Sequence, residues 1–120
     1  RRTASVPFPL WKQPDRLPAV LAELAGRFPD ATELAVTMTG ELCDCFETKR
    51  HGVDAILTAA EAAAHGRPVR VWGTDGRFVS AAEARREYLT VAAANWHALA
   101  TYAGRLVPTG RAVLIDVGST

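Results

Sequence analysis

Cysteine and an excess of charge of either sign are nearly absent from this chain, and each absence excludes a class of protein. Two cysteines, Cys43 and Cys45, occur in 120 residues. Their close spacing would strain a disulfide, and two thiols without further Cys or paired His make a poor zinc site. The 14 basic and 13 acidic residues leave a formal net charge of +1, which gives no reason to expect binding to nucleic acid or to a membrane surface.

Long hydrophobic runs are absent as well. No apolar stretch approaches the roughly 20 residues that span a membrane, and Arg1-Arg2 is followed by Thr, Ala and Ser instead of the apolar core of a signal peptide. Free thiols without a visible signal predict a cytoplasmic protein. A hydrophobic content of 48% and a charged content of 22% over 120 residues are typical of one soluble globular domain. The sequence gives no indication of oligomeric state.

The apolar pattern alternates between strand-like and helix-like segments. Val6–Trp11 is apolar but interrupted by prolines, which suits an edge strand or an extended lead-in. Helix signals include apolar residues at helical spacing after Pro14 and a capping box formed by Ser80 and Glu83. We therefore predict an α/β fold with a largely parallel or mixed sheet flanked by helices. The expected strands lie near Val6, over 33–39, over 69–72 and near Val113; the expected helices cover 14–28, 53–65 and one long segment after Ser80.

The last ten residues carry the most informative local motif. An apolar run, Ala112–Ile115, ends in Asp116, and Gly118, Ser119 and Thr120 follow. Glycine lets backbone amides approach a phosphate, the hydroxyls add donors, and the aspartate can hold a metal ion directly or through water. The alternative is a strand that ends in an ordinary turn, in which Asp and Ser are common.

The same motif predicts that the chain is an internal piece of a longer protein. A phosphate-binding turn needs the element that comes after it, and the sequence stops at Thr120. The sequence also begins with Arg1 and not with Met.

A second candidate site follows the predicted strand over residues 33–39. Ligands of open α/β sheets bind beyond the carboxyl ends of strands, which is where Thr39, Gly40 and Glu41 lie. Glu41 can act as an acid or base or orient a metal ion. Lys49 can neutralise negative charge that develops on a phosphate.

The alternative for this segment is a solvated loop followed by a helix cap. Asp44, otherwise a second candidate acid or base, would then only favour a helix N-terminus together with Glu47. We interpret Cys43 and Cys45 as small fillers beside Phe46, because the neighbouring acids raise a thiol pKa and do not activate the thiol.

Asn95, Trp96 and His97 form another candidate cluster, on the long helix expected after Ser80. Adjacent positions on a helix point in different directions, so one of the two rings can face the core while the other faces a cleft. We expect Trp96 in the core and His97 on the surface. Asn95 in a helix interior would be explained by a hydrogen-bonding task.

Six short strings of this sequence carry a resemblance to a known family. They are Pro9-Leu10-Trp11, Thr37–Leu42, Asp44–Lys49, Val71–Gly76, Ala94–Ala98 and Ile115–Thr120. In their order and spacing they resemble the hydantoinase/oxoprolinase-like family of tetrahydromethanopterin-linked C1 transfer pathway proteins. Its archaeal relatives include a methanofuran-biosynthesis enzyme that joins a furan-methylamine unit to a tyramine-derived partner. The resemblance covers nearly the whole chain.

The resemblance implies an actin-like ATPase fold, a ribonuclease H-like architecture in which two related lobes enclose a nucleotide or phosphate site. Residues 1–110 would be part of the first lobe. Residues 111–120 would be the first strand and phosphate loop of a truncated second lobe. The implied ligands are Mg²⁺, ATP or a pyrophosphate-containing compound, and a small-molecule substrate.

The resemblance also implies roles for single residues. Glu41 and Lys49 would be catalytic, and Asp116 would hold Mg²⁺. The residues expected to bind the phosphate ligand are Thr39, Gly40, Asp116, Gly118, Ser119 and Thr120.

Two classes of function stay open. In the first, the chain is a fragment of a phosphate-dependent enzyme of C1-carrier (tetrahydromethanopterin/methanofuran) biosynthesis. The reaction would be group transfer with loss of pyrophosphate or hydantoinase-like hydrolysis. In the second, the chain is a non-catalytic nucleotide-binding or scaffold module of the same superfamily. The enzyme needs both phosphate loops, and the first of them should lie just before Arg1, so the isolated chain is expected to be inactive.

Overall fold

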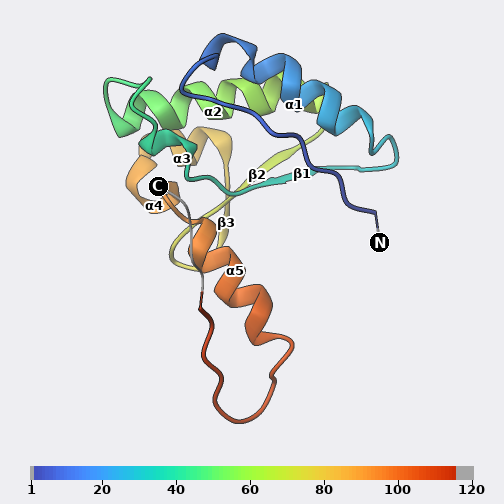
Figure 1. Ribbon diagram of the computed structural model, residues 1–120, viewed down its shortest axis with the longest axis vertical. Helices are drawn as coiled ribbons and strands as arrows, with labels where there is room; N and C mark the ends of the chain where they lie inside the picture. The colour runs from blue at the N-terminus through green and yellow to red at the C-terminus, as the bar shows by residue number, and fades with distance from the viewer. Residues whose placement is uncertain (1, 116–120) are drawn as a thin grey trace.

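The computed structural model describes residues 2–115 and shows a small sheet flanked by helices (Figure 1). This arrangement confirms the predicted α/β class in its coarse form. The elements in chain order are the 3-10 helix η1 (Pro14–Arg16), α1 (Leu17–Gly26), β1 (Leu34–Val36), the 3-10 helix η2 (Gly40–Leu42), α2 (Lys49–Ala64), β2 (Val69–Trp72), β3 (Phe78–Ser80), α3 (Ala81–Arg86), α4 (Tyr88–Val91) and α5 (Asn95–Gly104).

The sheet is mixed and has the strand order β1-β2-β3. β1 runs parallel to β2 with Leu34 opposite Val69, and β3 runs antiparallel to β2 with Val79 opposite Val71. A parallel pair requires a crossover connection, which α2 supplies. The predicted strand over 69–72 is therefore confirmed in full, and that over 33–39 is confirmed for Leu34–Val36, whereas β3 was not predicted.

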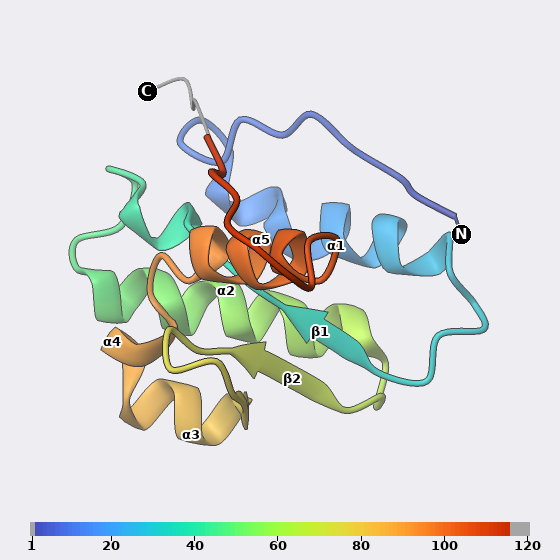
Figure 2. The same cartoon turned by 90° about the horizontal axis from the view of Figure 1, so that it is seen from below.

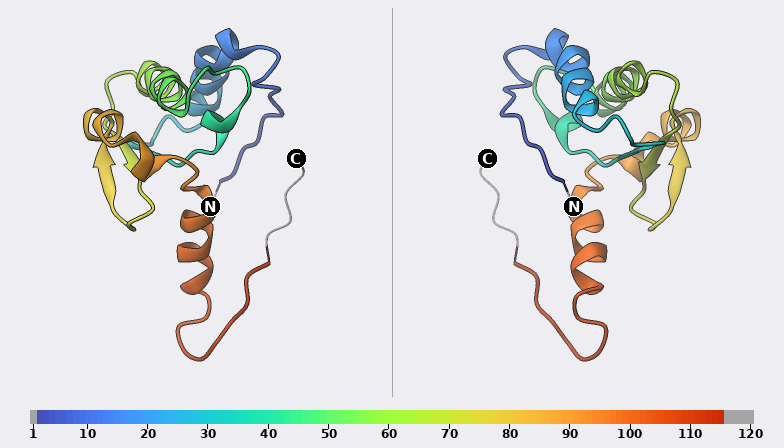
Figure 3. Two further views of the ribbon diagram at one scale, coloured as in Figure 1. Left: turned by 90° about the vertical axis from the view of Figure 1, so that its left-hand side faces the viewer. Right: turned by 90° about the vertical axis from the view of Figure 1, so that its right-hand side faces the viewer.

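The helices lie on both sides of the sheet. α1 and α2 pack side by side on one side (Figures 1 and 2), and α5 extends away from the opposite side (Figure 3). None of the helices within residues 2–115 combines the length and the apolar character needed to cross a membrane. The core lies where α2, α3, α4 and the sheet meet, and its buried members are Met38, Val53, Ile56, Leu57, Val71, Val79, Ala84 and Val91.

α1 forms as the apolar spacing predicts. The 3-10 turn at Pro14 leads into the helix, and Pro18 occupies its first turn, where a missing N–H costs nothing. Leu17, Leu21 and Leu24 are half-buried along the side that packs on α2. The helix ends at Gly26, close to the expected boundary.

α2 begins at Lys49, four residues before the predicted start at Val53. Its N-cap is Thr48, whose Oγ1 accepts a hydrogen bond from the His51 N–H at 3.1 Å. The helix ends as expected, with His65 in the left-handed region at φ 49° and Gly66 at φ 83°.

The long helix expected after Ser80 is wrong. Ser80 does cap a helix, since its Oγ accepts from the Glu83 N–H at 3.2 Å. That helix, α3, ends at Arg86, and α4 and α5 follow as separate elements. The break before α5 includes Ala93, which has φ 49°. An alanine gives no sequence signal for such a left-handed residue, because the conformation favours Gly or Asn.

Of the two alternatives for Val6–Trp11, the edge strand is wrong and the extended lead-in stays open, and the strand expected near Val113 does not form within the described residues. Residues 2–9 and 111–115 form no regular structure, and Val113 and Ile115 are 86% and 78% exposed. Pro7 and Pro9 offer no N–H for a ladder, and residues 111–115 find no partner strand in the described part of the chain. Whether a second lobe begins at residue 111 stays a prediction.

A tight turn over Thr74–Gly76 joins β2 to β3. Gly76 has φ 80° and donates its N–H to the Gly73 carbonyl at 3.1 Å. The Asp75 carboxylate accepts from the backbone N–H and from Nε of Arg77, at 3.1 and 2.8 Å. These hydrogen bonds hold the pKa of Asp75 below its usual value.

Candidate functional site

The carboxylate of Glu41 contacts a part of the chain that lies far away in the sequence. Oε1 of Glu41 accepts a hydrogen bond from the backbone N–H of Ala93 at 2.6 Å, across 52 positions of the sequence. The Glu41 side chain is 1% exposed. Its second oxygen, Oε2, is buried and has no hydrogen-bond partner within residues 2–115. The structure therefore joins η2, which follows β1 in the chain, to the break before α5 through one buried acid.

Gly52 on α2 lets the chain around Glu41 approach the helix closely. A Cβ at Gly52 would lie 2.7 Å from Cα, 2.8 Å from the carbonyl oxygen and 2.9 Å from Cβ of Glu41. Real Cβ atoms do not approach this closely, so only glycine fits. η2 is held directly against the first turns of α2 as a result.

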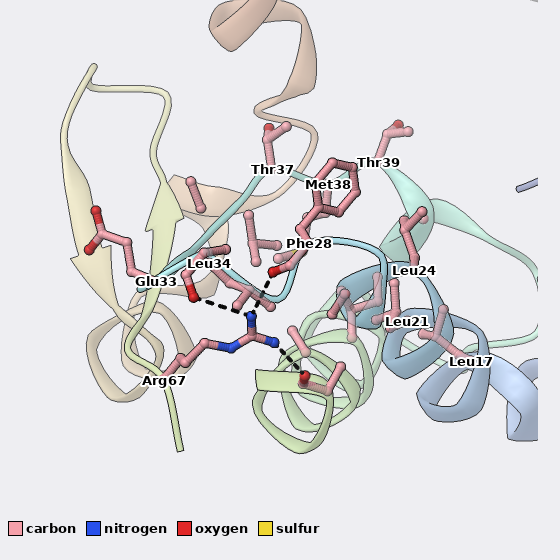
Figure 4. Close-up of a pocket in the computed structure, with 18 of the residues that line it drawn as sticks. Leu17, Leu21, Leu24, Phe28, Glu33, Leu34, Thr37, Met38, Thr39 and Arg67 are labelled. Carbon is pink, nitrogen blue, oxygen red and sulfur yellow. Dashed lines mark hydrogen bonds between the residues drawn. The ribbon is translucent and has the colours of Figure 1, made fainter. Parts of the chain in front are cut away.

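Thr39 and Gly40 lie beside an apolar pocket between α1, β1 and α2 (Figure 4). The pocket has a volume of about 650 Å³. Thr39 is exposed, and a Cβ at Gly40 would lie 3.0 Å from Cδ2 of Leu10 and 3.4 Å from Cδ1 of Ile56. Glu41 is not among the residues that line this pocket.

The guanidinium of Arg67 reaches this pocket but is already bonded to backbone carbonyls (Figure 4). Nε donates to Ala64 O at 2.8 Å, and the two Nη atoms donate to the carbonyls of Ala63, Phe28 and Ala31 at 3.3 to 3.5 Å. Arg67 thus ties the C-terminus of α2 to the connection between α1 and β1. It is not arranged to receive a phosphate, and the pocket wall is mainly apolar.

Lys49 occupies the first position of α2 and is exposed. Its side chain forms no ion pair or hydrogen bond within residues 2–115, and the structure does not pair it with Glu41. Asp44 and Glu47 are exposed in the preceding loop, where they precede the Thr48 cap. The roles assigned to Glu41 and Lys49 remain predictions.

The predicted phosphate loop and magnesium ligand, Asp116, Gly118, Ser119 and Thr120, lie outside the described residues. Among residues 2–115, no group of three or more His, Cys, Asp or Glu side chains is arranged to hold a metal ion. The described part of the chain contains the region around Glu41, and the phosphate loop stays a prediction.

The orientation expected for Trp96 and His97 is reversed. Trp96 is 56% exposed, whereas His97 is half-buried and stacks on Trp72 with 5.8 Å between ring centroids. Nε1 of Trp72 donates to Nδ1 of His97 at 3.2 Å. The expectation failed because helical spacing shows that neighbours diverge but not which of them faces the sheet.

Cys43 and Cys45 are free thiols, both half-buried, with 3.0 Å between their sulfur atoms. Burial is the main cause that raises the pKa of Cys45 to about 11, and the hydrogen bond to Cys43 contributes. The predicted direction of the pKa shift is confirmed, although Asp44 is only a minor cause. This is an unreactive thiol, in agreement with a packing role.

We expect Cys45 of the folded protein to react slowly with iodoacetamide. A rise in pKa from 9.0 to about 11 leaves about 100-fold less thiolate at pH 8. Because folding keeps this thiol neutral, the stability it contributes is present below pH 9.0 and is lost as the pH rises towards about 11. Mass spectrometry of the alkylated peptide, with urea-unfolded protein as the control, measures the ratio of rates. Equal rates in the two states would contradict the raised pKa.

The fold is of the α/β class expected from the sequence. Comparison with known proteins gives the family. The hydantoinase/oxoprolinase family profile matches residues 33–120. The chain belongs to this family. It is also 37% identical over 114 residues to a (furan-2-yl)methanamine synthase of Methanocaldococcus jannaschii, whose full name includes a gamma-glutamylaminoethyl-phenoxymethyl substituent. That match covers 94% of this chain and 33% of the synthase, so the chain spans about a third of its relative's length.

Sequence reasoning identified Glu41 but missed the residues that hold it. Gly52 lies before the start predicted for its helix, and a glycine was the available signal for a close approach of backbone. Ala93 offered no signal at all, because its function in the contact is carried by a backbone N–H.

Proposed function

We propose that this chain is part of a phosphate-dependent enzyme of C1-carrier biosynthesis, in the tetrahydromethanopterin and methanofuran branch of metabolism. The observation that carries the proposal is the 37% identity to the archaeal synthase over 94% of the chain. Identity at this level over nearly every element makes a shared reaction class the first hypothesis. The whole protein's substrate and activity remain part of the proposal.

The name of the relative favours group transfer over hydrolysis. A phenoxymethyl-furan contains an ether bond between a phenol oxygen and a CH₂ group on the furan ring. Such a bond forms when the phenol oxygen displaces a leaving group from that carbon, and pyrophosphate is a good leaving group. Hydantoinase-like hydrolysis stays the second candidate, because the family's description includes it.

The residues of this chain can be given roles in that reaction. Asp116 would hold Mg²⁺, which in proteins is bound by one or two carboxylates together with substrate phosphates. These residue types fit this ion, because the hydroxyls of Ser119 and Thr120 offer further oxygen ligands to the metal or hydrogen-bond donors to the phosphate. When bound, Mg²⁺ would neutralise the charge of the departing pyrophosphate. Lys49 would add a positive charge, and Thr39 and Gly40, at the start of η2, would bind the phosphate ligand.

The alternative function is a non-catalytic nucleotide-binding or scaffold module within the actin-like superfamily, whose lobe architecture we also propose for this chain. The two functions differ in turnover and agree in phosphate binding. Titration of the protein with pyrophosphate, ATP and Mg²⁺, followed by an assay for product formation, therefore separates them. Binding without turnover in a polypeptide as long as the archaeal relative would favour the module.

The 120-residue chain by itself is expected to turn over neither pyrophosphate nor ATP. Phosphate transfer depends on groups that surround the phosphate from several sides, and this chain spans a third of its relative. A malachite-green assay for released phosphate, with added pyrophosphatase as a positive control, checks this. Turnover above the buffer blank would refute the division of the site that we propose.

A further inference from the structure

We infer that Glu41 is a positioning residue, whose buried carboxylate fixes the start of α5 through the backbone N–H of Ala93. The inference deepens the proposed function, since it assigns a role within the same site. It also replaces the acid or base chemistry expected for Glu41 with a structural task that the contacts support.

The carboxylate is placed for holding backbone and not for meeting a substrate. It is 1% exposed, and Oε1 is engaged by the Ala93 N–H at 2.6 Å. Among residues 2–115, Glu41 is the one buried side chain of a charged type, and it forms no ion pair there. A group that transfers a proton to a substrate needs to lie within hydrogen-bond reach of that substrate.

The backbone on both sides of the carboxylate is constrained. On one side, Gly52 packs against the Glu41 backbone with no room for a Cβ. On the other side, Ala93 has a φ of 49°, which an alanine adopts only when its surroundings hold it there. The hydrogen bond from Ala93 to Glu41 therefore connects η2, which packs on α2, to the break between α4 and α5.

What this contact positions is the first turn of α5. Asn95 begins the helix, and His97 is anchored to β2 by the hydrogen bond from Trp72. The Ala93 contact and the Trp72 contact thus hold the turn at two points on either side of Asn95. Beyond this turn α5 extends away from the sheet (Figures 1 and 3), so these anchors set its direction.

The experiment compares three variants of the protein at its natural length. Glu41→Gln keeps an oxygen that can accept from the Ala93 N–H, and Glu41→Met keeps the length of the side chain but removes the acceptor. Glu47→Gln changes an exposed acid in the preceding loop and serves as the matched control. Hydrogen exchange at the Ala93 amide, resolved by electron-transfer fragmentation, reports the contact directly, and the rate of product formation reports its consequence.

If Glu41 is a positioning residue, Glu41→Gln and Glu47→Gln should keep Ala93 exchange and kcat within about threefold of the original protein. Glu41→Met should speed Ala93 exchange by about tenfold or more, because a buried hydrogen bond is lost. Glutamine would then rescue what methionine loses, which an acid or base role does not allow.

Other results overturn the inference. A loss of kcat of about 100-fold or more in Glu41→Gln, with Ala93 protection intact, would show that the carboxylate acts on the substrate. Faster exchange in Glu41→Gln, or unchanged exchange in Glu41→Met, would show that acceptance from Ala93 is not its task. If Glu41→Met does not fold, the kcat and the Ala93 exchange of Glu41→Gln still distinguish a positioning role from an acid or base role. If the original protein makes no product, the proposed function fails and the exchange data still test the contact.

Discussion

Replacing Gly52 by alanine is expected to destabilise the fold by about 3 kcal/mol, at the upper end of the cost of overpacking a core. The added Cβ would lie 2.7 to 2.9 Å from Cα, the carbonyl oxygen and Cβ of Glu41. Two of these three atoms belong to the backbone, so no rotamer change relieves the clash. α2 and η2 would have to separate, and the buried Glu41 carboxylate would lose its position against Ala93.

Thermal unfolding followed by circular dichroism measures this effect, and a fall in melting temperature of more than about 10 °C is expected. Gly26→Ala is the matched control, because no atom lies within 4 Å of a Cβ at that helical position. The control should leave stability unchanged or raise it by about 0.5–1 kcal/mol, the usual gain of alanine over glycine in a helix. A Gly52→Ala protein that melts with the original would show that η2 does not pack on α2 as described.

The elements that sequence patterns predicted well are those whose own residues determine them. α1 carries its apolar face in its spacing, and β2 is a short apolar run between Pro68 and the turn that begins at Gly73. The helix cap at Ser80 was equally local, because one hydroxyl and one backbone N–H are enough. Each of these predictions needed no knowledge of what packs against the element.

The predictions that failed depended on a partner elsewhere in the chain. The run around Val113 has the composition of a buried strand, yet a strand forms only where another edge accepts its hydrogen bonds. The helix expected across residues 92–94 is interrupted at Ala93, whose N–H binds Glu41. Long-range contacts of this kind override helical propensity and leave no trace in the local pattern.

The candidate site also has features that the sequence predicted and features that it did not. Glu41 could be identified because it follows a strand end and lies in a string that resembles the family. The burial of Glu41 and its hydrogen bond to Ala93 could not be predicted, because an acid after a strand is usually exposed. Trp96 and His97 were recognised as a pair, but the ring that faces the sheet was fixed by Trp72, 25 positions away from His97.

Asp116→Asn is expected to abolish metal-dependent phosphate binding. The protein tested contains this chain and is as long as the archaeal relative. Asparagine keeps the size and part of the hydrogen-bonding capacity of aspartate but removes the negative charge that a hard cation needs. The chemical step should slow by about two to four powers of ten, as is typical when an electrostatic group of this kind is lost. Folding should be little affected, since the substitution is conservative in volume.

The competing interpretation of Asp116 gives the opposite result for the same variant. If the residue only shapes a turn, asparagine should replace it well, because both are favoured turn formers. Isothermal titration of Mg²⁺ and pyrophosphate, read beside the melting temperature, separates the two interpretations. Ser119→Ala is a useful companion, because it removes one hydroxyl and leaves the charge, and should weaken binding less. Unchanged affinity together with unchanged melting in Asp116→Asn would mean that the segment holds no phosphate, and the proposal of a phosphate-dependent enzyme would then rest on the family relationship alone.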